Sequence, residues 1–209
     1  MDHSLLTQLE TIRQSQQHRF DSRTPAEQRN RRGQFATPPL LAREIARYLR
    51  MVAGDNLPNL SFADPALGSG SLYAAALAEF GAERIVSAIG IEIDEDRGSI
   101  ARTIWAETGL RVVCGDCIAF ITNDHSTPNL IIANPPYVRH HHLDPATKRR
   151  LQALTAQRTG IHVSGLAGLY VYVVLLSMAW LARSGYAAWL LPAEWMDVGY
   201  GAFSANKRH

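Results

Sequence analysis

The chain has 209 residues, enough for one α/β domain with a sizeable hydrophobic core. A hydrophobic content of 46% and a charged content of 19% are typical of a globular protein and exclude a chain too polar to fold. The net charge of +2 and the pI near 8.7 permit a nucleic-acid partner without requiring one.

Residues 1–32 are predicted to form a helical and basic segment ahead of the main domain, which we expect over residues 33–209. Four apolar residues of this segment fall on one face of a helix: Leu5, Leu6, Leu9 and Ile12. The segment is otherwise polar and charged and does not resemble a signal peptide, so the predicted location is the cytoplasm. Thr37 is predicted to cap a helix that runs from Pro38 to about Leu49.

Strands and helices alternate through the rest of the chain. The predicted strands are the apolar runs Leu60–Ala63, Ile85–Ile93, Leu110–Val113, Leu130–Ala133 and Tyr186–Leu191. Helices are expected between the first three strands, one ending at Phe80 and one over Asp96–Thr108. Because crossovers between parallel strands are right-handed, this order predicts an α/β fold with a parallel sheet and helices on both faces.

The uncharged stretch Val163–Ala182 is long enough to cross a membrane. Its aromatic residues Tyr170, Tyr172 and Trp180 are spread along it, whereas the aromatic residues of a membrane span collect at its two ends. We therefore predict a helix buried behind the sheet, after a long loop that follows the fourth strand, and expect no membrane partner.

Cysteine and histidine residues form two short clusters. Cys114 and Cys117 suggest a redox pair or half of a zinc site, but no second cysteine pair exists and no helix clearly begins there. The adjacent residues His140, His141 and His142 cannot easily converge on one ion, and a solvated loop is expected. The sequence therefore predicts no metal.

The tetrapeptide Asn134-Pro135-Pro136-Tyr137 directly follows the fourth strand, where open α/β sheets place their ligand crevice. Its two prolines fix φ and remove two backbone donors, which leaves a stiff turn with carbonyls that can accept. A planar group with an exocyclic amine suits it, because the Asn134 side chain and the Pro135 carbonyl could accept the two N–H bonds while the ring stacks on Tyr137. A proline-rich turn with no chemistry is the alternative.

A glycine-rich turn at Asp64–Ser71 joins the first strand to a helix, and its glycines let a ligand approach the backbone closely. The dinucleotide fingerprint fails because Tyr73 stands at the third glycine position. Asp64 disfavours phosphate and favours an ammonium group. Glu92 and Asp116, at the next two strand ends, suit a ribose and an adenine amino group. S-adenosylmethionine has these three parts and is the predicted cofactor.

These residues resemble the gamma-class N6-adenine DNA methyltransferases. The similarity to motifs X, I, II, III and IV of that family lies, in that order, at Gly33–Pro38, Asp64–Gly70, Glu92, Asp116 and Asn134–Tyr137. The resemblance implies a Rossmann-like class I S-adenosylmethionine-dependent methyltransferase fold and transfer of a methyl group to N6 of adenine in DNA, often within restriction–modification systems. Leu67 stands where the family frequently has cysteine.

The resemblance also implies a role for each matched position. The methionine portion of the cofactor would be lined by Phe35, Thr37, Asp64, Ala66 and Gly68. Glu92 would hold its ribose and Asp116 its adenine amino group. The target adenine would be flipped out of the duplex, with its N6 bound by Asn134 and Pro135 and its ring stacked on Tyr137.

The family pattern continues past residue 209 with further strands and a target-recognition domain, so we expect the chain to be incomplete at its C-terminus. A second chain is the expected source of target recognition. Two basic groups could meet DNA phosphates: Arg29, Arg31 and Arg32, and then Arg139, Lys148, Arg149 and Arg150. A protein-glutamine or RNA methyltransferase remains an alternative, because a side-chain amide also offers two N–H bonds. The other alternative is a non-catalytic, cofactor-binding subunit or remnant.

Overall fold

The computed structural model describes residues 3–31, 33–54 and 59–193. Its centre is a five-stranded parallel sheet with the strand order β3-β2-β1-β4-β5. The strands are β1 (Leu60–Asp64), β2 (Ile85–Glu92), β3 (Leu110–Cys114), β4 (Leu130–Ala133) and β5 (Tyr186–Trp189). The predicted parallel α/β sheet is thereby confirmed, with each strand within two residues of its expected bounds.

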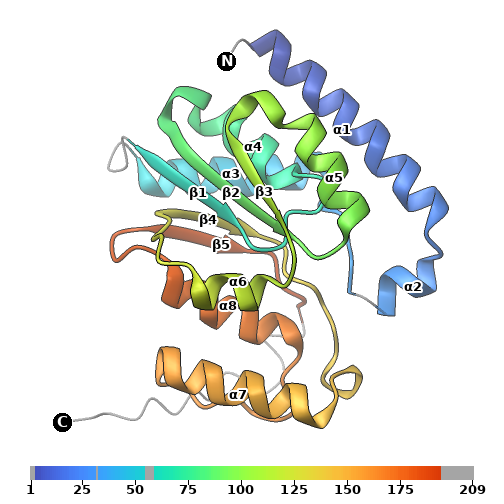
Figure 1. The fold of residues 1–209 in the computed structure, drawn as a ribbon. Helices are drawn as coiled ribbons and strands as arrows, with labels where there is room; N and C mark the ends of the chain where they lie inside the picture. Colours follow the sequence, from blue (N-terminus) through green and yellow to red (C-terminus); the bar gives the residue numbers. More distant parts are fainter. Residues whose placement is uncertain (1–2, 32, 55–58, 194–209) are drawn as a thin grey trace.

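Helices cover both faces of this sheet (Figure 1). One face carries α3 (Pro39–Ala53), α4 (Ser71–Phe80) and α5 (Glu95–Ile104), while α1 (His3–Arg23) lies outside α4 and α5. The opposite face carries α6 (Cys117–Asn123) and α8 (Leu169–Trp180), with α7 (Pro145–Thr159) packed outside α8. The short helix α2 (Ala26–Arg31) follows α1, and single 3-10 turns lie at Ala82–Arg84, Ala106–Thr108 and His140–His142.

Two hydrophobic clusters result, one on each face. Side chains of a strand alternate between faces, so Phe62 packs with α3, α4 and α5, whereas its neighbour Ala63 packs with α6 and α8. All four residues of β4 are buried, as expected for a central parallel strand covered on both sides. This rigid centre fixes the carboxyl ends of β1, β2, β3 and β4 along one edge of the sheet.

Several sequence predictions for the helices need correction. The expected long loop after β4 contains α7, and a helix does begin at Cys117, where none was clear. The apolar helix α8 is shorter than the uncharged stretch that contains it. Within the described part of the chain, no helix combines the length and apolarity that a membrane crossing requires.

The predicted cap of α3 is also wrong. Pro38, not Thr37, precedes the first helical residue, and no side-chain hydrogen bond caps this end of α3. Pro39 and Pro38 have no N–H to be capped, which removes part of the need for a cap. The Thr37 hydroxyl instead lies at the carboxyl end of β4, where it accepts a hydrogen bond from Asn134.

Only part of the apolar face predicted for the N-terminal segment packs against the rest of the protein. Leu6 and Leu9 pack against the cluster formed by α3, α4 and α5, but Leu5 and Ile12 are exposed. The inward face of α1 runs instead through the half-buried Leu6 and Leu9 and the buried Arg13, which are spaced three and four residues apart. An arginine therefore occupies a position where a hydrophobic residue would be expected.

Candidate functional site

A cavity of about 820 Å³ opens along the carboxyl ends of the strands. Eight of the residues that the sequence singled out line it: Phe35, Thr37, Asp64, Ala66, Gly68, Glu92, Asp116 and Asn134. Pro135 and Tyr137 lie beside the cavity and are not part of its described lining. The loops after β1, β2, β3 and β4 thus share one hollow, as the parallel topology requires.

The glycine-rich loop presents Asp64 at the floor of this cavity. Asp64 is only 1% exposed, and its Oδ1 accepts a hydrogen bond of 2.9 Å from the backbone N–H of Ala66. Burial raises the pKa of the Asp64 carboxyl from 3.8 to about 7, because the charged form loses its hydration. A cationic group brought next to it would favour the charged carboxylate and would itself be stabilised.

Glu92 ties the end of β2 to the glycine-rich loop. Its Oε2 accepts from the N–H of Gly68 and its Oε1 from the N–H of Asp94, both at 2.8 Å. Burial raises the pKa of the Glu92 carboxyl above its ordinary value, while these hydrogen bonds and the nearby Arg97 oppose the rise. Each carboxylate oxygen keeps one further lone pair for a ligand.

Leu67 belongs to the glycine-rich loop, and its side chain packs against β2. It is buried, and a Cβ atom added to Gly90 of β2 would lie 2.6 Å from its Cδ1. The glycine in β2 therefore makes room for leucine at the position where the family often has cysteine.

Asp116 lines the cavity and directly precedes α6. Its Oδ1 caps the helix by accepting from the N–H of Ile118 at 2.9 Å, and its Oδ2 lies 3.8 Å from Nη2 of Arg150. Burial and the adjacent Asp116 charge raise the pKa of the Cys117 thiol to about 12, so this thiol stays neutral and unreactive. Among the described residues, no group of histidine, cysteine and acidic side chains could hold a metal ion.

Asn134 closes the β4 side of the cavity. Its Nδ2 donates to the backbone carbonyl of Phe35 at 2.9 Å and to Oγ1 of Thr37 at 3.1 Å. The Phe35 carbonyl can only accept, so its bond fixes which end of the amide faces this segment. The Asn134 Oδ1 atom is buried and has no hydrogen-bond partner among the residues that the structure describes. A polar acceptor in this condition favours a ligand that donates to it.

Tyr137 is held on several sides. Its ring stacks on Phe35 with a centroid distance of 5.7 Å and meets Tyr170 edge-on at 6.2 Å. Its hydroxyl donates to the carbonyl of Leu190 at 2.9 Å, and its N–H donates to the carbonyl of Gly33 at 3.2 Å. The segment that resembles motif X and the tetrapeptide that resembles motif IV, about a hundred residues apart in sequence, therefore form one packed unit.

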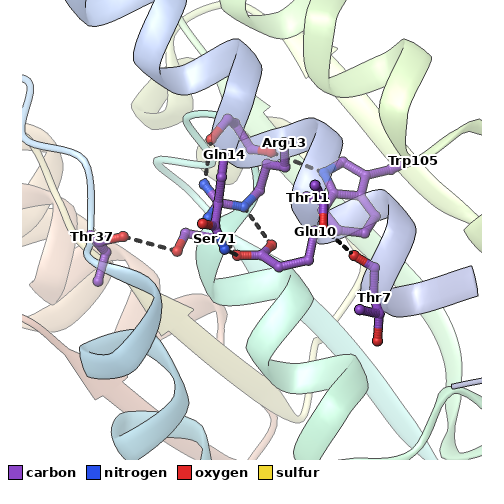
Figure 2. A network of polar contacts seen from close by, with 9 residues as sticks. Thr7, Glu10, Thr11, Arg13, Gln14, Thr37, Ser71 and Trp105 are labelled. Atoms are coloured by element: carbon purple, nitrogen blue, oxygen red, sulfur yellow. Dashed lines mark hydrogen bonds and ion pairs between the residues drawn. The ribbon is translucent and has the colours of Figure 1, made fainter. Parts of the chain in front are cut away.

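Sequence reasoning missed the contribution of α1. Arg13 is 2% exposed, lines the cavity and donates from Nη1 to the Ser69 hydroxyl at 3.0 Å. The indole N–H of Trp105 donates to the Ser69 carbonyl, and the Ser71 hydroxyl to the Thr37 carbonyl, both at 2.9 Å (Figure 2). The available signal was the charged residue within the apolar stripe of the first helix.

Comparisons with known proteins relate the chain to methyltransferases of restriction–modification systems. Residues 116–208 match the family of the Eco57I restriction-modification methylase. The type II methyltransferase M.XamI of Xanthomonas campestris pv. amaranthicola is 30% identical over 181 residues, which are 82% of this chain and 32% of that protein. M.AccI of Acinetobacter calcoaceticus, also a type II methyltransferase, is 25% identical over 177 residues, or 84% of this chain and 30% of that protein. The chain is a homologue of restriction–modification methyltransferases.

This methyltransferase homologue spans about a third of the length of the two relatives. A Listeria monocytogenes protein assigned to the class I S-adenosylmethionine-dependent methyltransferases matches 91% of the chain and 56% of its own, with a TM-score of 0.69 and 18% identity. The methyltransferase subunit of a type I restriction-modification system from Streptococcus thermophilus matches 77% of the chain and 35% of its own, with a TM-score of 0.61 and 18% identity. The fold is therefore that of class I methyltransferases.

This relationship implies S-adenosylmethionine as the cofactor, and the residues of the cavity fit it. The volume of about 820 Å³ lies within the range of about 300–1,000 Å³ that is usual for small-molecule sites. The cavity offers carboxylates at three successive strand ends, at Asp64, Glu92 and Asp116. Several lining residues also carry buried polar atoms that have no hydrogen-bond partner in the described parts of the chain, namely Gln17, Gln34, Arg97 and Asn134.

Proposed function

We propose that this chain contains the cofactor-binding and methyl-transfer site of an enzyme that methylates N6 of adenine in DNA as part of a restriction–modification system. The observation that carries the proposal is the amide of Asn134. Its N–H bonds are engaged by Phe35 and Thr37, which leaves its buried Oδ1 as an acceptor on the cavity wall. An exocyclic amino group is the kind of substrate group that donates to such an acceptor.

The cofactor would lie along the strand ends. We assign its methionine portion to the glycine-rich loop, where Asp64 would accept from the ammonium group, and to the segment with Phe35 and Thr37. Its ribose would be held by the remaining lone pairs of Glu92. Its adenine amino group would donate to Oδ2 of Asp116, because Oδ1 is used by the helix cap and Oδ2 has only the 3.8 Å ion pair with Arg150. Ala66 and Gly68 would form the wall beside the methionine portion.

When bound, S-adenosylmethionine supplies an electrophilic methyl group on a sulfonium sulfur. The amino nitrogen of adenine is a poor nucleophile because its lone pair is delocalised into the ring. Asn134 Oδ1 and the Pro135 carbonyl would each accept one of its N–H bonds, which favours a pyramidal nitrogen with a localised lone pair. The new N–C bond would replace the S–C bond of the donor, and the cationic nitrogen that results would release one proton to water, because neither acceptor is a base. Fixed dipoles of this kind contribute by orientation and by charge stabilisation.

The target adenine would have to leave the DNA duplex to reach this site, at a cost of a few kcal/mol in lost stacking and pairing. Tyr137 would support the flipped base, although Phe35 already covers part of its ring. Exposed arginines near the tetrapeptide, at Arg139, Arg149 and Arg150, would meet phosphates. Target recognition would come from elsewhere, with a second chain as one source. We expect the protein to act in the cytoplasm.

The proposal is tested by incubating the chain with methyl-labelled S-adenosylmethionine and, separately, DNA, RNA and a glutamine-bearing peptide. The expected product is N6-methyladenine in DNA, identified by mass spectrometry of the nucleosides, with no label in the other two substrates. Asn134→Ala serves as the matched inactive variant. Label only in peptide or in RNA would reject the DNA assignment. Cofactor binding without transfer to any substrate, when the protein that supplies target recognition is also present, would reject the catalytic one.

A further inference from the structure

The inner face of α1 forms one wall of the cavity. Arg13 and Gln17, one helical turn apart, are both among the lining residues. All the positions assigned above to the cofactor lie after residue 33, so the N-terminal helix adds a wall that neither the motifs nor the family match assigns.

Arg13 fastens this wall to the glycine-rich loop. Its Nη1 donates to the Ser69 hydroxyl at 3.0 Å, while its Nε and Nη2 donate to the two carboxylate oxygens of Glu10, each at 2.6 Å. Glu10 and Arg13 thereby form a forked ion pair with a fixed orientation. The contact residue Ser69 directly follows Gly68, so this part of α1 lies beside the portion of the loop assigned to the methionine group.

A second contact, between α1 and α5, lies one turn beyond Gln17. The Arg97 guanidinium sits over the ring of Phe20 at 4.1 Å, and its Nη2 lies 3.9 Å from Oδ1 of Asp21. Arg97 belongs to the first turn of α5 and also lines the cavity. Gln17 is therefore held between two anchored points of α1.

The side-chain amide of Gln17 has a buried donor without an acceptor among the described residues. Its Nε2 is buried and has no hydrogen-bond partner in residues 3–31, 33–54 and 59–193. A buried amide donor left unpaired is costly, and such a group commonly marks the place of a ligand atom. Because Nε2 is a donor, the matching ligand atom is an acceptor.

We propose that Gln17 donates a hydrogen bond to the carboxylate of the amino-acid portion of S-adenosylmethionine, and that Arg13 is a positioning residue that holds Gln17 in place. The inference rests on the proposed function. The ammonium and carboxylate groups of that portion share one carbon atom, so a site with an acceptor for the first needs a donor nearby for the second. Asp64 is the acceptor, and Gln17 supplies a neutral donor that lines the same cavity.

Calorimetry with two ligands tests this assignment. S-adenosylmethionine and its decarboxylated form differ only in the carboxylate, so the ratio of their affinities reports the contact. Gln17→Ala is expected to weaken binding of S-adenosylmethionine about tenfold or more and to leave binding of the decarboxylated form unchanged. Gln8→Ala, an exposed glutamine on the same helix outside the cavity, is the matched control and should change neither affinity.

Arg13→Lys gives the second readout, because lysine cannot reproduce the forked contacts to Glu10 and Ser69. It should lower the same affinity ratio as Gln17→Ala. Loss of both affinities in parallel, or no loss in Gln17→Ala, would overturn the inference while leaving the proposed function intact. If the unaltered chain bound neither ligand, the proposed function would fail as well. Thermal unfolding of each ligand-free variant shows whether the fold is kept.

Discussion

Gly33 and Tyr137 meet through their backbones. The Tyr137 N–H donates to the Gly33 carbonyl at 3.2 Å, and a Cβ atom on Gly33 would lie 2.4 Å from the Tyr137 nitrogen. Gly33 also has a φ of 61°, a left-handed conformation that residues with a side chain adopt at a cost. The contact places Phe35 and Thr37 where they orient the Asn134 amide.

Gly33→Ala should therefore separate these two segments. Left-handed strain alone costs about 1 kcal/mol, and the clash with backbone atoms of Tyr137 should destabilise the fold by about 1–3 kcal/mol more. Chemical denaturation measures the loss. Gly160→Ala is the control, because Gly160 has a φ of 72° but its added Cβ would meet no atom of the described residues within 4 Å. Equal losses in both variants would show that the contact with Tyr137 is unimportant.

Cofactor affinity should depend on pH through Asp64. Its pKa of about 7 in the free protein means that the carboxyl is mostly protonated at pH 5.5 and mostly charged at pH 7.5. Binding of an ammonium group requires the charged form, so affinity should rise more than tenfold between these pH values. Asp64→Asn should bind weakly with a flat profile. A wild-type affinity that is constant or falls over this range would contradict the assignment.

The same pKa has a consequence for stability of the ligand-free fold. The folded state holds the Asp64 proton more tightly than the unfolded chain, whose ordinary pKa is 3.8. The contribution of Asp64 to stability should therefore decline as pH rises from about 4 to about 7. Asp64→Asn should remove this decline, which unfolding measured across that range would show.

Asn134→Ala should affect transfer more than cofactor binding. The substitution removes the free Oδ1 acceptor, and loss of one such polar contact to a reacting group typically lowers the rate by about a hundredfold or more. Single-turnover measurements at saturating cofactor isolate this step. A modest loss of cofactor affinity is also expected, because Nδ2 no longer holds Phe35 and Thr37. A variant that transfers methyl groups at the original rate would disprove the role of Asn134.

Leu67 and Gly90 should behave as a complementary pair. Leu67→Ala leaves a cavity under the glycine-rich loop and should cost about 2–5 kcal/mol. Gly90→Ala brings a methyl group to 2.6 Å from Leu67 Cδ1 and should cost about 1–3 kcal/mol. The double variant should cost less than the sum, because each change relieves the other. Strictly additive losses of unfolding free energy would show that the two positions are independent.

The sheet could be predicted from sequence because its strands have a strong local signal. The residues of β4 form one apolar run, and such runs between turn residues indicate buried parallel strands. The convergence of Asp64, Glu92 and Asp116 then followed from topology, since parallel strands end at one edge. Neither the sheet nor the convergence of its strand ends depends on where a side chain points.

The helix α7 was missed although it carries terminal signals. Asp144 caps it by accepting from the N–H of Thr147, Pro145 occupies its first turn, and Gly160 ends it. Its sequence lacks a continuous apolar stripe: Leu151 is buried and Leu154 only partly so, and the rest is largely polar. Hydrophobic periodicity alone therefore predicts a loop here.

The hydrogen bonds that orient the side chains of the site could not be predicted. Thr37 has the sequence signature of a helix cap, yet its hydroxyl accepts from Asn134, a residue 97 positions later. Arg13 reaches Ser69 across 56 positions. Such long-range hydrogen bonds depend on how α1 packs on α4 and α5 and on where the segment before α3 lies, and local sequence patterns do not encode that placement.

The central claim is that the loops after β1, β2 and β3 bind different parts of one cofactor molecule. Titration of the isotope-labelled chain with S-adenosylmethionine, followed by the backbone amide resonances of Ala66, Gly68, Asp94 and Ile118, tests it most directly. These N–H groups donate to Asp64, Glu92 and Asp116. We predict that all four shift with a single dissociation constant. Shifts confined to one loop, or different constants for different loops, would contradict a shared site.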